Sequence, residues 1–346
     1  MTASVRRFRP RPLFSACTGA GPRWLVAAAL CCATTLAQAA GFAFIQVPAD
    51  KDGPALRGAV WSPCSTPPGR IDLAPLVLQG TRDCPLAGQG LPLIVVSHGA
   101  GGSALGHHDT AAALADAGYV VAAINHPGDN FQDTSRQGHL SAFATRPVDI
   151  KRLTDYMLGA WPQHAQLDAG KVGFFGFSRG GYTGLVAAGA VPDWTLRPDL
   201  CPPLSTRPLC GEVRRNEIPA TLAPDARIKA AVIVDPLSVF DAKGLGQVGV
   251  PVQLWASALG GDGVTPQSVE TLRHGLHRPP EWHVAANGGH YAFLAPCSPA
   301  LAEVAADICR DAAGFDRAAF HQVFNAQVVG FLQQHIPVGN MSGKAP

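Results

Sequence analysis

The segment Lys171-Val-Gly-Phe-Phe-Gly-Phe-Ser-Arg-Gly-Gly-Tyr-Thr-Gly-Leu-Val-Ala-Ala188 decides the fold. Its first half is an apolar run that ends at Phe177 and predicts a buried strand, and its second half predicts a helix. Between them, Gly176-Phe177-Ser178-Arg179-Gly180 predicts a sharp turn, because the two glycines remove side chains where the turn would clash. Such a turn lifts the Ser178 hydroxyl above the sheet, whereas a serine that only capped a helix would not require the paired glycines.

Similar apolar runs recur on both sides of this segment and alternate with helical patterns. Parallel sheets hide such strands between two layers of helices. We therefore predict an α/β fold with a doubly wound, mostly parallel sheet, helices on both faces, and antiparallel strands 42–47 and 56–61 at one edge. The other predicted strands are 93–97, 119–125, 171–177, 229–235, 252–257 and 282–286, and the predicted helices are 109–117, 147–158, 179–188, 266–276 and 316–334.

The stretch 191–225 interrupts this rhythm. It is rich in proline and too long for an ordinary connection between a helix and a strand, so we predict an insertion after the helix that follows Ser178. Two interpretations stay open: a cap that shapes a substrate pocket, or a surface excursion tied by a disulfide. We expect residues 40–338 to form a single domain that includes this insertion, and residues 339–346 to form a flexible tail.

The N-terminal residues 1–39 have the composition of a signal peptide. They hold five arginines and no acidic residue, followed by an apolar stretch at 24–36 and by Ala37-Gln38-Ala39. The apolar stretch is shorter than the ~20 residues of a membrane span, so we expect no permanent span after cleavage and a periplasmic or secreted protein. Because the leader carries the positive balance, nucleic acid is not an expected partner.

Six cysteines remain after the leader and fall into three couples that are close in sequence. In an oxidising compartment each couple predicts a disulfide that closes a short loop. None has Cys-x-x-Cys spacing or histidines at zinc-ligand intervals, and we predict no metal site. The couples are Cys64/Cys84, Cys201/Cys210 and Cys297/Cys309.

A serine becomes a nucleophile only when a neighbouring base removes its proton, and the order expected along the chain is serine, acid, histidine. His290, in Asn287-Gly288-Gly289-His290-Tyr291, is the predicted base because it follows the last predicted strand in a glycine-rich turn. Two acids stay open. Asp262 follows the second strand beyond the serine and is the one we favour, while Asp235 ends the first such strand, also at the carboxyl edge of the sheet.

Acyl transfer also requires hydrogen-bond donors for the developing oxyanion. The loop Ser97-His98-Gly99-Ala100-Gly101-Gly102 follows a predicted strand, and its glycines let the backbone approach a ligand. We predict the amides of Ala100 and Arg179 as the donors and expect His98 to brace the loop. A nucleotide-binding loop is disfavoured, because neither phosphate-binding glycine pattern is present in it.

Three aromatic residues, Trp194, Tyr291 and Phe293, are predicted to line an apolar acyl pocket. Arg146 and Asp149 are close in sequence and predict a structural ion pair, with a contact between Arg146 and a substrate carboxylate as the alternative.

In their order along the chain, five motifs resemble those of the α/β-hydrolase superfamily, and most closely its exported dienelactone-hydrolase-like and platelet-activating-factor-acetylhydrolase-like branch. The motifs are Ser97-His98-Gly99-Ala100-Gly101-Gly102, His126-Pro127-Gly128-Asp129, Arg146-Pro147-Val148-Asp149, Gly176-Phe177-Ser178-Arg179-Gly180-Gly181 and Gly289-His290-Tyr291-Ala292-Phe293-Leu294.

The resemblance implies an ester hydrolase with the triad Ser178, Asp262 or Asp235, and His290. The acetylhydrolase type takes its acid from the first strand after the serine, which favours Asp235, and polyester and lipase relatives take it from the second, which favours Asp262. True dienelactone hydrolases carry a cysteine nucleophile where this chain has Ser178, so their substrate is not expected here.

The predicted function is hydrolysis of small-molecule or lipid-like carboxylic esters through an acyl-enzyme on Ser178, with no metal or organic cofactor. Two alternatives stay open: a peptidase-like amide hydrolase on the same fold, and an exported binding protein that kept the fold without the chemistry.

Overall fold

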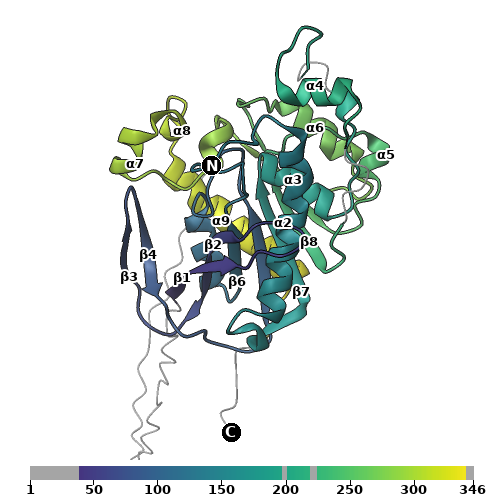
Figure 1. The fold of residues 1–346 in the computed structure, drawn as a ribbon. Helices are drawn as coiled ribbons and strands as arrows, with labels where there is room; N and C mark the ends of the chain where they lie inside the picture. The colour runs from purple at the N-terminus through teal and green to yellow at the C-terminus, as the bar shows by residue number, and fades with distance from the viewer. Residues whose placement is uncertain (1–38, 197–200, 219–223, 340–346) are drawn as a thin grey trace, which may run out of the picture. The chain divides into compact units, whose positions relative to one another are not determined.

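A ten-stranded sheet forms the centre of the protein in the computed structural model, which describes residues 39–196, 201–218 and 224–339. Its strands follow one another in space as β10 (Glu281–Ala285), β9 (Val252–Ser257), β8 (Ile228–Val234), β7 (Leu167–Phe177), β5 (Leu91–Ser97), β6 (Val120–Ile124), β2 (Leu56–Cys64), β1 (Ala39–Val47), β4 (Leu76–Arg82) and β3 (Gly69–Leu73). Figure 1 labels the strands from β8 to β3 in this order, except β5.

The direction of the strands divides the sheet into two parts. From β10 to β6 every neighbouring pair is parallel, and β2 and β1 then add antiparallel strands beyond β6, as predicted. The hairpin of β3 and β4 joins β1 through only two residue pairs. The predicted doubly wound, mostly parallel sheet is confirmed, but the hairpin was not predicted, because its strands are short and half exposed.

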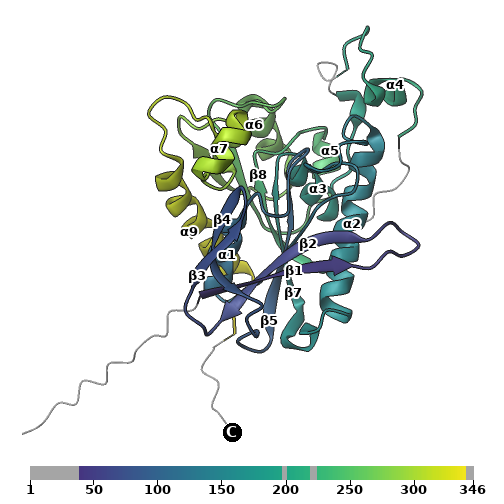
Figure 2. The same ribbon diagram turned by 60° about the vertical axis from the view of Figure 1, so that its left-hand side comes forward.

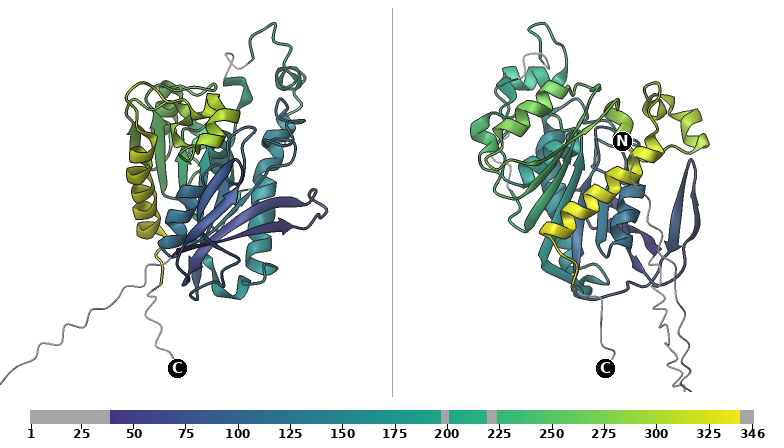
Figure 3. Two further views of the ribbon diagram at one scale, coloured as in Figure 1. Left: turned by 90° about the vertical axis from the view of Figure 1, so that its left-hand side faces the viewer. Right: turned by 180° about the vertical axis from the view of Figure 1, so that it is seen from behind.

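Two layers of helices cover the sheet, as Figures 2 and 3 show. On one face, Tyr182 and Leu185 pack in the same core as Phe174 of β7, while on the other Phe324 and Leu332 share a core with Phe175. The first face carries α2 (Leu140–Gly159), α3 (Arg179–Ala187), α5 (Ala242–Leu245) and α6 (Pro266–Gly275); the second carries α1 (His108–Asp116) and α9 (Arg317–His335).

Two predicted elements differ from the structure. Helix α2 begins at Leu140, seven residues before the predicted start, and Pro147 lies inside it. A proline removes a helical hydrogen bond and is usual at a first turn, but here Phe143, Ile150 and Leu153 bury one side of a continuous helix. Strand β10 is half exposed, because it forms the edge of the sheet.

The three predicted disulfides are present, between Cys64 and Cys84, Cys201 and Cys210, and Cys297 and Cys309. The first ties the end of β2 to the chain just after β4, and the last encloses α7 (Pro299–Val304) and α8 (Ala306–Cys309). The second lies between α3 and β8, where the described residues form η2 (Trp194–Leu196) and α4 (Pro208–Arg214). Two further short helices are η1 (His164–Gln166) and η3 (His290–Phe293).

The predicted leader lies outside the described residues, except for Ala39, which begins β1. Most of the predicted tail also lies outside them. Across the described part of the chain, no helix is long and apolar enough to cross a membrane.

Candidate active site

Ser178 lies on the sharp turn that was predicted between β7 and α3. Its backbone has φ 56°, a left-handed conformation that is unusual for a residue with a side chain. The two flanking glycines are required by close backbone approaches: a Cβ on Gly180 would collide with the Ser97 carbonyl, and a Cβ on Gly176 would collide with the carbonyl of Gly180. The glycines therefore let α3 begin directly against the end of β5 and present the serine at the top of the sheet.

His290 is in hydrogen-bond contact with Ser178. Its Nε2 atom lies 2.9 Å from Ser178 Oγ, and both residues are buried. The imidazole packs on the Phe177 ring at 4.6 Å between centroids, and the His290 amide donates to the Gly260 carbonyl. The predicted turn after β10 thus brings the only histidine that we singled out as a base to the serine.

The acid in contact with His290 is Asp235, not the favoured Asp262. Asp235 Oδ2 lies 2.6 Å from His290 Nδ1, and the carboxylate also accepts hydrogen bonds from the Ser257 amide at 2.8 Å and the Ser257 hydroxyl at 2.7 Å. It is fully buried, directly after β8. These three bonds fix the plane of the carboxylate and, through it, the orientation of the imidazole.

The preference for Asp262 is therefore corrected. Asp262 lies on an exposed turn and makes no hydrogen bond or ion pair with His290 within the described residues. The turn does approach His290, because a Cβ on Gly261 would lie 3.0 Å from His290 Cβ, but it does so with its backbone. The sequence placed both acids at the carboxyl edge of the sheet, and the path of each loop decided between them.

The predicted oxyanion donors lie on either side of Ser178. Arg179 provides the first amide of α3, which has no partner within the helix, and the amide of Ala100 has no acceptor within the described residues. Gly101 adopts φ 58°, a conformation open to glycine, and its amide donates to Asp129 Oδ1 at 3.1 Å. This hydrogen bond fixes the conformation of the loop next to Ala100.

A buried ion-pair network holds this loop from behind. Arg146 is fully buried and donates to Asp129 Oδ2 at 2.8 Å and to the carbonyls of His98 at 2.7 Å and Gly99 at 3.0 Å. The Arg179 side chain donates to the same Asp129 oxygen at 2.7 Å. Burial raises the pKa of Asp129, the two guanidinium groups lower it, and the net shift is downward, so the carboxylate is ionised at neutral pH.

The predicted pair of Arg146 and Asp149 is absent, because Arg146 bonds Asp129 instead. Asp149 lies 3.0 Å from His126 Nδ1, whose Nε2 lies 2.9 Å from Ser97 Oγ. Burial raises the pKa of Asp149 to about 7. It also lowers the pKa of His126 well below its usual range, so this histidine is neutral.

His98 braces the loop, as predicted. Burial holds its pKa well below the usual range. Its Nδ1 lies 2.7 Å from the Gly99 carbonyl and its Nε2 accepts from the His126 amide at 3.2 Å, which together define a neutral ring protonated on Nδ1. Sequence reasoning missed this network, although the motifs around His126 and Arg146 had marked its members.

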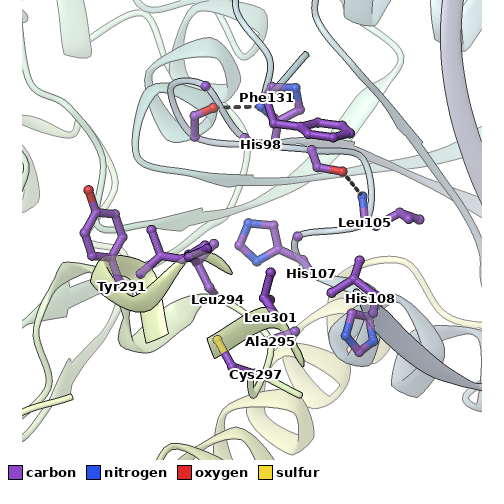
Figure 4. Close-up of a pocket in the computed structure, with 18 of the residues that line it drawn as sticks. His98, Leu105, His107, His108, Phe131, Tyr291, Leu294, Ala295, Cys297 and Leu301 are labelled. Carbon is purple, nitrogen blue, oxygen red and sulfur yellow. Dashed lines mark hydrogen bonds between the residues drawn. The ribbon is translucent and has the colours of Figure 1, made fainter. Parts of the chain in front are cut away.

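Two cavities meet at Ser178. The first has a volume of about 530 Å³ and contains His290 and Tyr291 in its wall. Figure 4 shows Tyr291 at this cavity. The second, of about 510 Å³, contains Arg179 and Trp194. Of the three predicted pocket residues, Tyr291 and Trp194 therefore line cavities, each a different one.

Phe293 does not line either cavity, which corrects the third prediction. It is fully buried in the core beneath α9 and packs edge-on against Trp255 and Phe320. The short helix η3 turns successive side chains in different directions, so Tyr291 faces the cavity while Phe293 faces the core. No group of three or more potential metal ligands is found among the described residues.

The sheet topology and the serine turn after β7 define the α/β-hydrolase fold. No protein-family model and no curated protein sequence matches the chain. Among solved structures, the chain is similar to the ferulic acid esterase from Streptomyces cinnamoneus, with a TM-score of 0.58 and 18% sequence identity over 90% of this chain and 95% of the esterase chain. At this identity the similarity concerns the fold.

Proposed function

We propose that the protein is a serine hydrolase that cleaves carboxylic esters through an acyl-enzyme on Ser178. The observation that carries the proposal is the continuous chain of hydrogen bonds from Ser178 Oγ to His290 Nε2 and from His290 Nδ1 to Asp235 Oδ2, at 2.9 and 2.6 Å. Nucleophile, base and orienting acid within hydrogen-bond reach are the arrangement that activates a serine.

In the first half-reaction Ser178 Oγ attacks the ester carbonyl carbon while His290 Nε2 takes the hydroxyl proton. The carbonyl oxygen becomes an oxyanion that accepts hydrogen bonds from the amides of Ala100 and Arg179. The bond to the alcohol oxygen then breaks, His290 returns the proton to that oxygen, and the acyl group remains on Ser178.

In the second half-reaction water replaces the alcohol. His290 takes a proton from the water, the resulting hydroxide attacks the acyl-enzyme carbonyl, and the same two amides donate hydrogen bonds to the oxyanion. Collapse of this intermediate breaks the bond to Ser178, whose oxygen recovers the proton from His290, and the carboxylic acid is released. Asp235 keeps Nδ1 as the donor throughout and stabilises the imidazolium.

The similar solved structure supports the choice of esters, since that protein is a ferulic acid esterase. The assignment to the dienelactone-hydrolase-like and acetylhydrolase-like branch remains a prediction from the sequence motifs. We also propose that the protein is exported: the three disulfides are consistent with an oxidising compartment, and residues 1–39 have the pattern of a signal peptide.

A fluorophosphonate probe tests the proposal directly. We expect it to label the wild-type protein but not Ser178→Ala, and we expect the wild type alone to hydrolyse p-nitrophenyl acetate. The substitution removes only one oxygen from a small side chain, so we expect both proteins to fold. Thermal unfolding of the two proteins under the same conditions checks this.

The two alternatives predict other outcomes. A peptidase would cleave amino-acyl anilides as fast as esters, and a binding protein would neither be labelled nor hydrolyse either substrate. Either result would overturn the proposal.

A further inference from the structure

We propose, on the basis of the proposed function, that the substrate is an ester with one extended apolar arm, and that this arm occupies the first cavity beside Ser178. The cavity volume of about 530 Å³ lies within the range of about 300–1,000 Å³ that accommodates small-molecule ligands. Ser178 and His290 both line this cavity, so a group that enters it is continuous with the reacting carbonyl.

The side chains around the cavity are mainly apolar. Figure 4 shows Tyr291 and Leu294 on one side and Leu105 and His108 on the other, with Leu301 between them. Burial lowers the pKa of His108, and His107 has a pKa lowered to about 4 by burial, so neither imidazole contributes a charge at neutral pH. The wall thus offers an extended alkyl or aryl group contact without a buried charge.

Apart from the Asp262 carboxylate, the exposed side chains of the cavity wall are apolar as well. Phe131 and Val304 line the cavity and are 60% and 72% exposed, among the most exposed large hydrophobic residues of the described chain. Exposed apolar side chains gathered at a cavity mark a binding surface rather than ordinary surface. They allow an apolar arm to be partly desolvated before it reaches the serine.

The outer wall is built by two segments that lie outside the parallel sheet. The turn of the β3–β4 hairpin, residues 73–76, and the pair α7–α8 both line the cavity, and Ser298 Oγ donates to the Pro75 carbonyl at 2.6 Å, which joins them. Disulfides hold both segments, through Cys64–Cys84 and Cys297–Cys309. The walls are therefore tethered in place in the free protein, which lowers the cost of ordering them around a ligand.

The second cavity has a different character. Polar side chains such as Thr134 and Gln137 share its wall with Trp194 and Leu209. An ester that spans Ser178 would therefore place its extended apolar arm in the first cavity and its more polar or shorter part in the second.

Two ester series test this inference on the purified, oxidised protein: p-nitrophenyl acyl esters from acetate to decanoate, and acetates of alcohols from ethanol to octanol. Because burial of one methylene is worth ~0.8 kcal/mol, kcat/KM should rise by up to about fourfold per methylene in at least one series, until the cavity is full. Flat profiles in both series would overturn the inference.

A pocket-filling variant identifies the cavity. Ala305 lines it, so Ala305→Trp should lower the ratio of kcat/KM for the octanoate or octyl ester over the shortest ester by tenfold or more. Ala302 lies nearby on α7 but is exposed and outside the cavity, so Ala302→Trp should leave this ratio unchanged. A ratio that is equally preserved in both variants would refute the assignment of the arm to this cavity.

The ratio of kcat/KM for the long ester over the short ester tests this inference separately from the proposed function. A general loss of active enzyme lowers both values equally and leaves the ratio unchanged. Failure of fluorophosphonate labelling and of all ester turnover would refute the proposed function itself. Labelling and turnover without a dependence on chain length would refute only the apolar arm.

Discussion

Replacement of each candidate acid by asparagine distinguishes their roles sharply. Asp235→Asn keeps the size of the side chain but places an amide in a site where Oδ1 accepts from the Ser257 amide and Oδ2 accepts from both the Ser257 hydroxyl and His290 Nδ1. With Oδ1 retained toward the Ser257 amide, the new NH₂ group faces His290 Nδ1. Two donors then face each other unless His290 changes tautomer.

In the other tautomer His290 carries its proton on Nε2 and cannot accept the proton of Ser178. A substitution of this kind in a serine triad lowers kcat by ~10⁴-fold, or ~5 kcal/mol in the activation free energy. We therefore expect Asp235→Asn to lose about that factor in kcat for p-nitrophenyl acetate. Asp262→Asn should change kcat by less than about threefold, because its carboxylate is exposed and makes no hydrogen bond with the imidazole within the described residues.

The assay is steady-state hydrolysis with both variants and the wild type, together with thermal unfolding to show that all three fold. A large loss in Asp262→Asn with near-normal Asp235→Asn would refute the reasoning, since it would mean that the hydrogen bond of 2.6 Å to Asp235 does not orient the base.

Two further predictions concern the groups behind the oxyanion loop. Arg146→Met removes the guanidinium that pairs with the buried Asp129 carboxylate, so we expect a loss of ~3–5 kcal/mol in unfolding free energy and a fall of ~10²-fold in kcat with little change in KM. The control Lys151→Met, on the exposed side of α2, should change neither quantity. A lower unfolding free energy with an unchanged kcat would show that Arg146 has a structural role only. Asp149 has a pKa raised to about 7 by burial. Its stabilising contribution to the unfolding free energy is therefore fully present below about pH 4 and is lost as the pH rises through 7. Relative to wild type, Asp149→Asn should therefore gain melting temperature between pH 5 and pH 8, and a constant difference would contradict the raised pKa.

Patterns of local sequence were sufficient for most of the fold. Apolar runs predicted every strand of the parallel series from β10 to β6, because most of these strands are buried on both faces and leave little room for polar residues. The β3–β4 hairpin was missed, because its strands alternate weakly, and the early start of α2 was missed, because Pro147 resembles a first turn. Short edge elements and the interiors of helices are decided by tertiary packing, which local patterns do not contain.

Local sequence patterns likewise predicted Ser178 and His290, which lie in contact, but could not choose between the two acids. Asp235 and Asp262 both follow strands at the correct edge, and only the path of each loop in space brings one carboxylate to Nδ1. The buried Arg146 was expected near Asp149, three residues away on the same helix, yet it bonds Asp129 from a different loop. Such contacts depend on where the loops meet in space. The separation of two residues along the chain does not predict them.

The hydrogen bond from Ser298 to Pro75 has a consequence for how such a protein can diversify. It joins two segments outside the parallel sheet to each other, while the proposed reacting groups follow strands of that sheet and make no hydrogen bond with either segment within the described residues. If the proposed function holds, insertions, deletions or exchanges in the hairpin or in α7–α8 would change the shape of the first cavity and leave the contacts among Ser178, His290 and Asp235 as they are. For engineering, the wall of the first cavity can be redesigned separately from the proposed reacting groups.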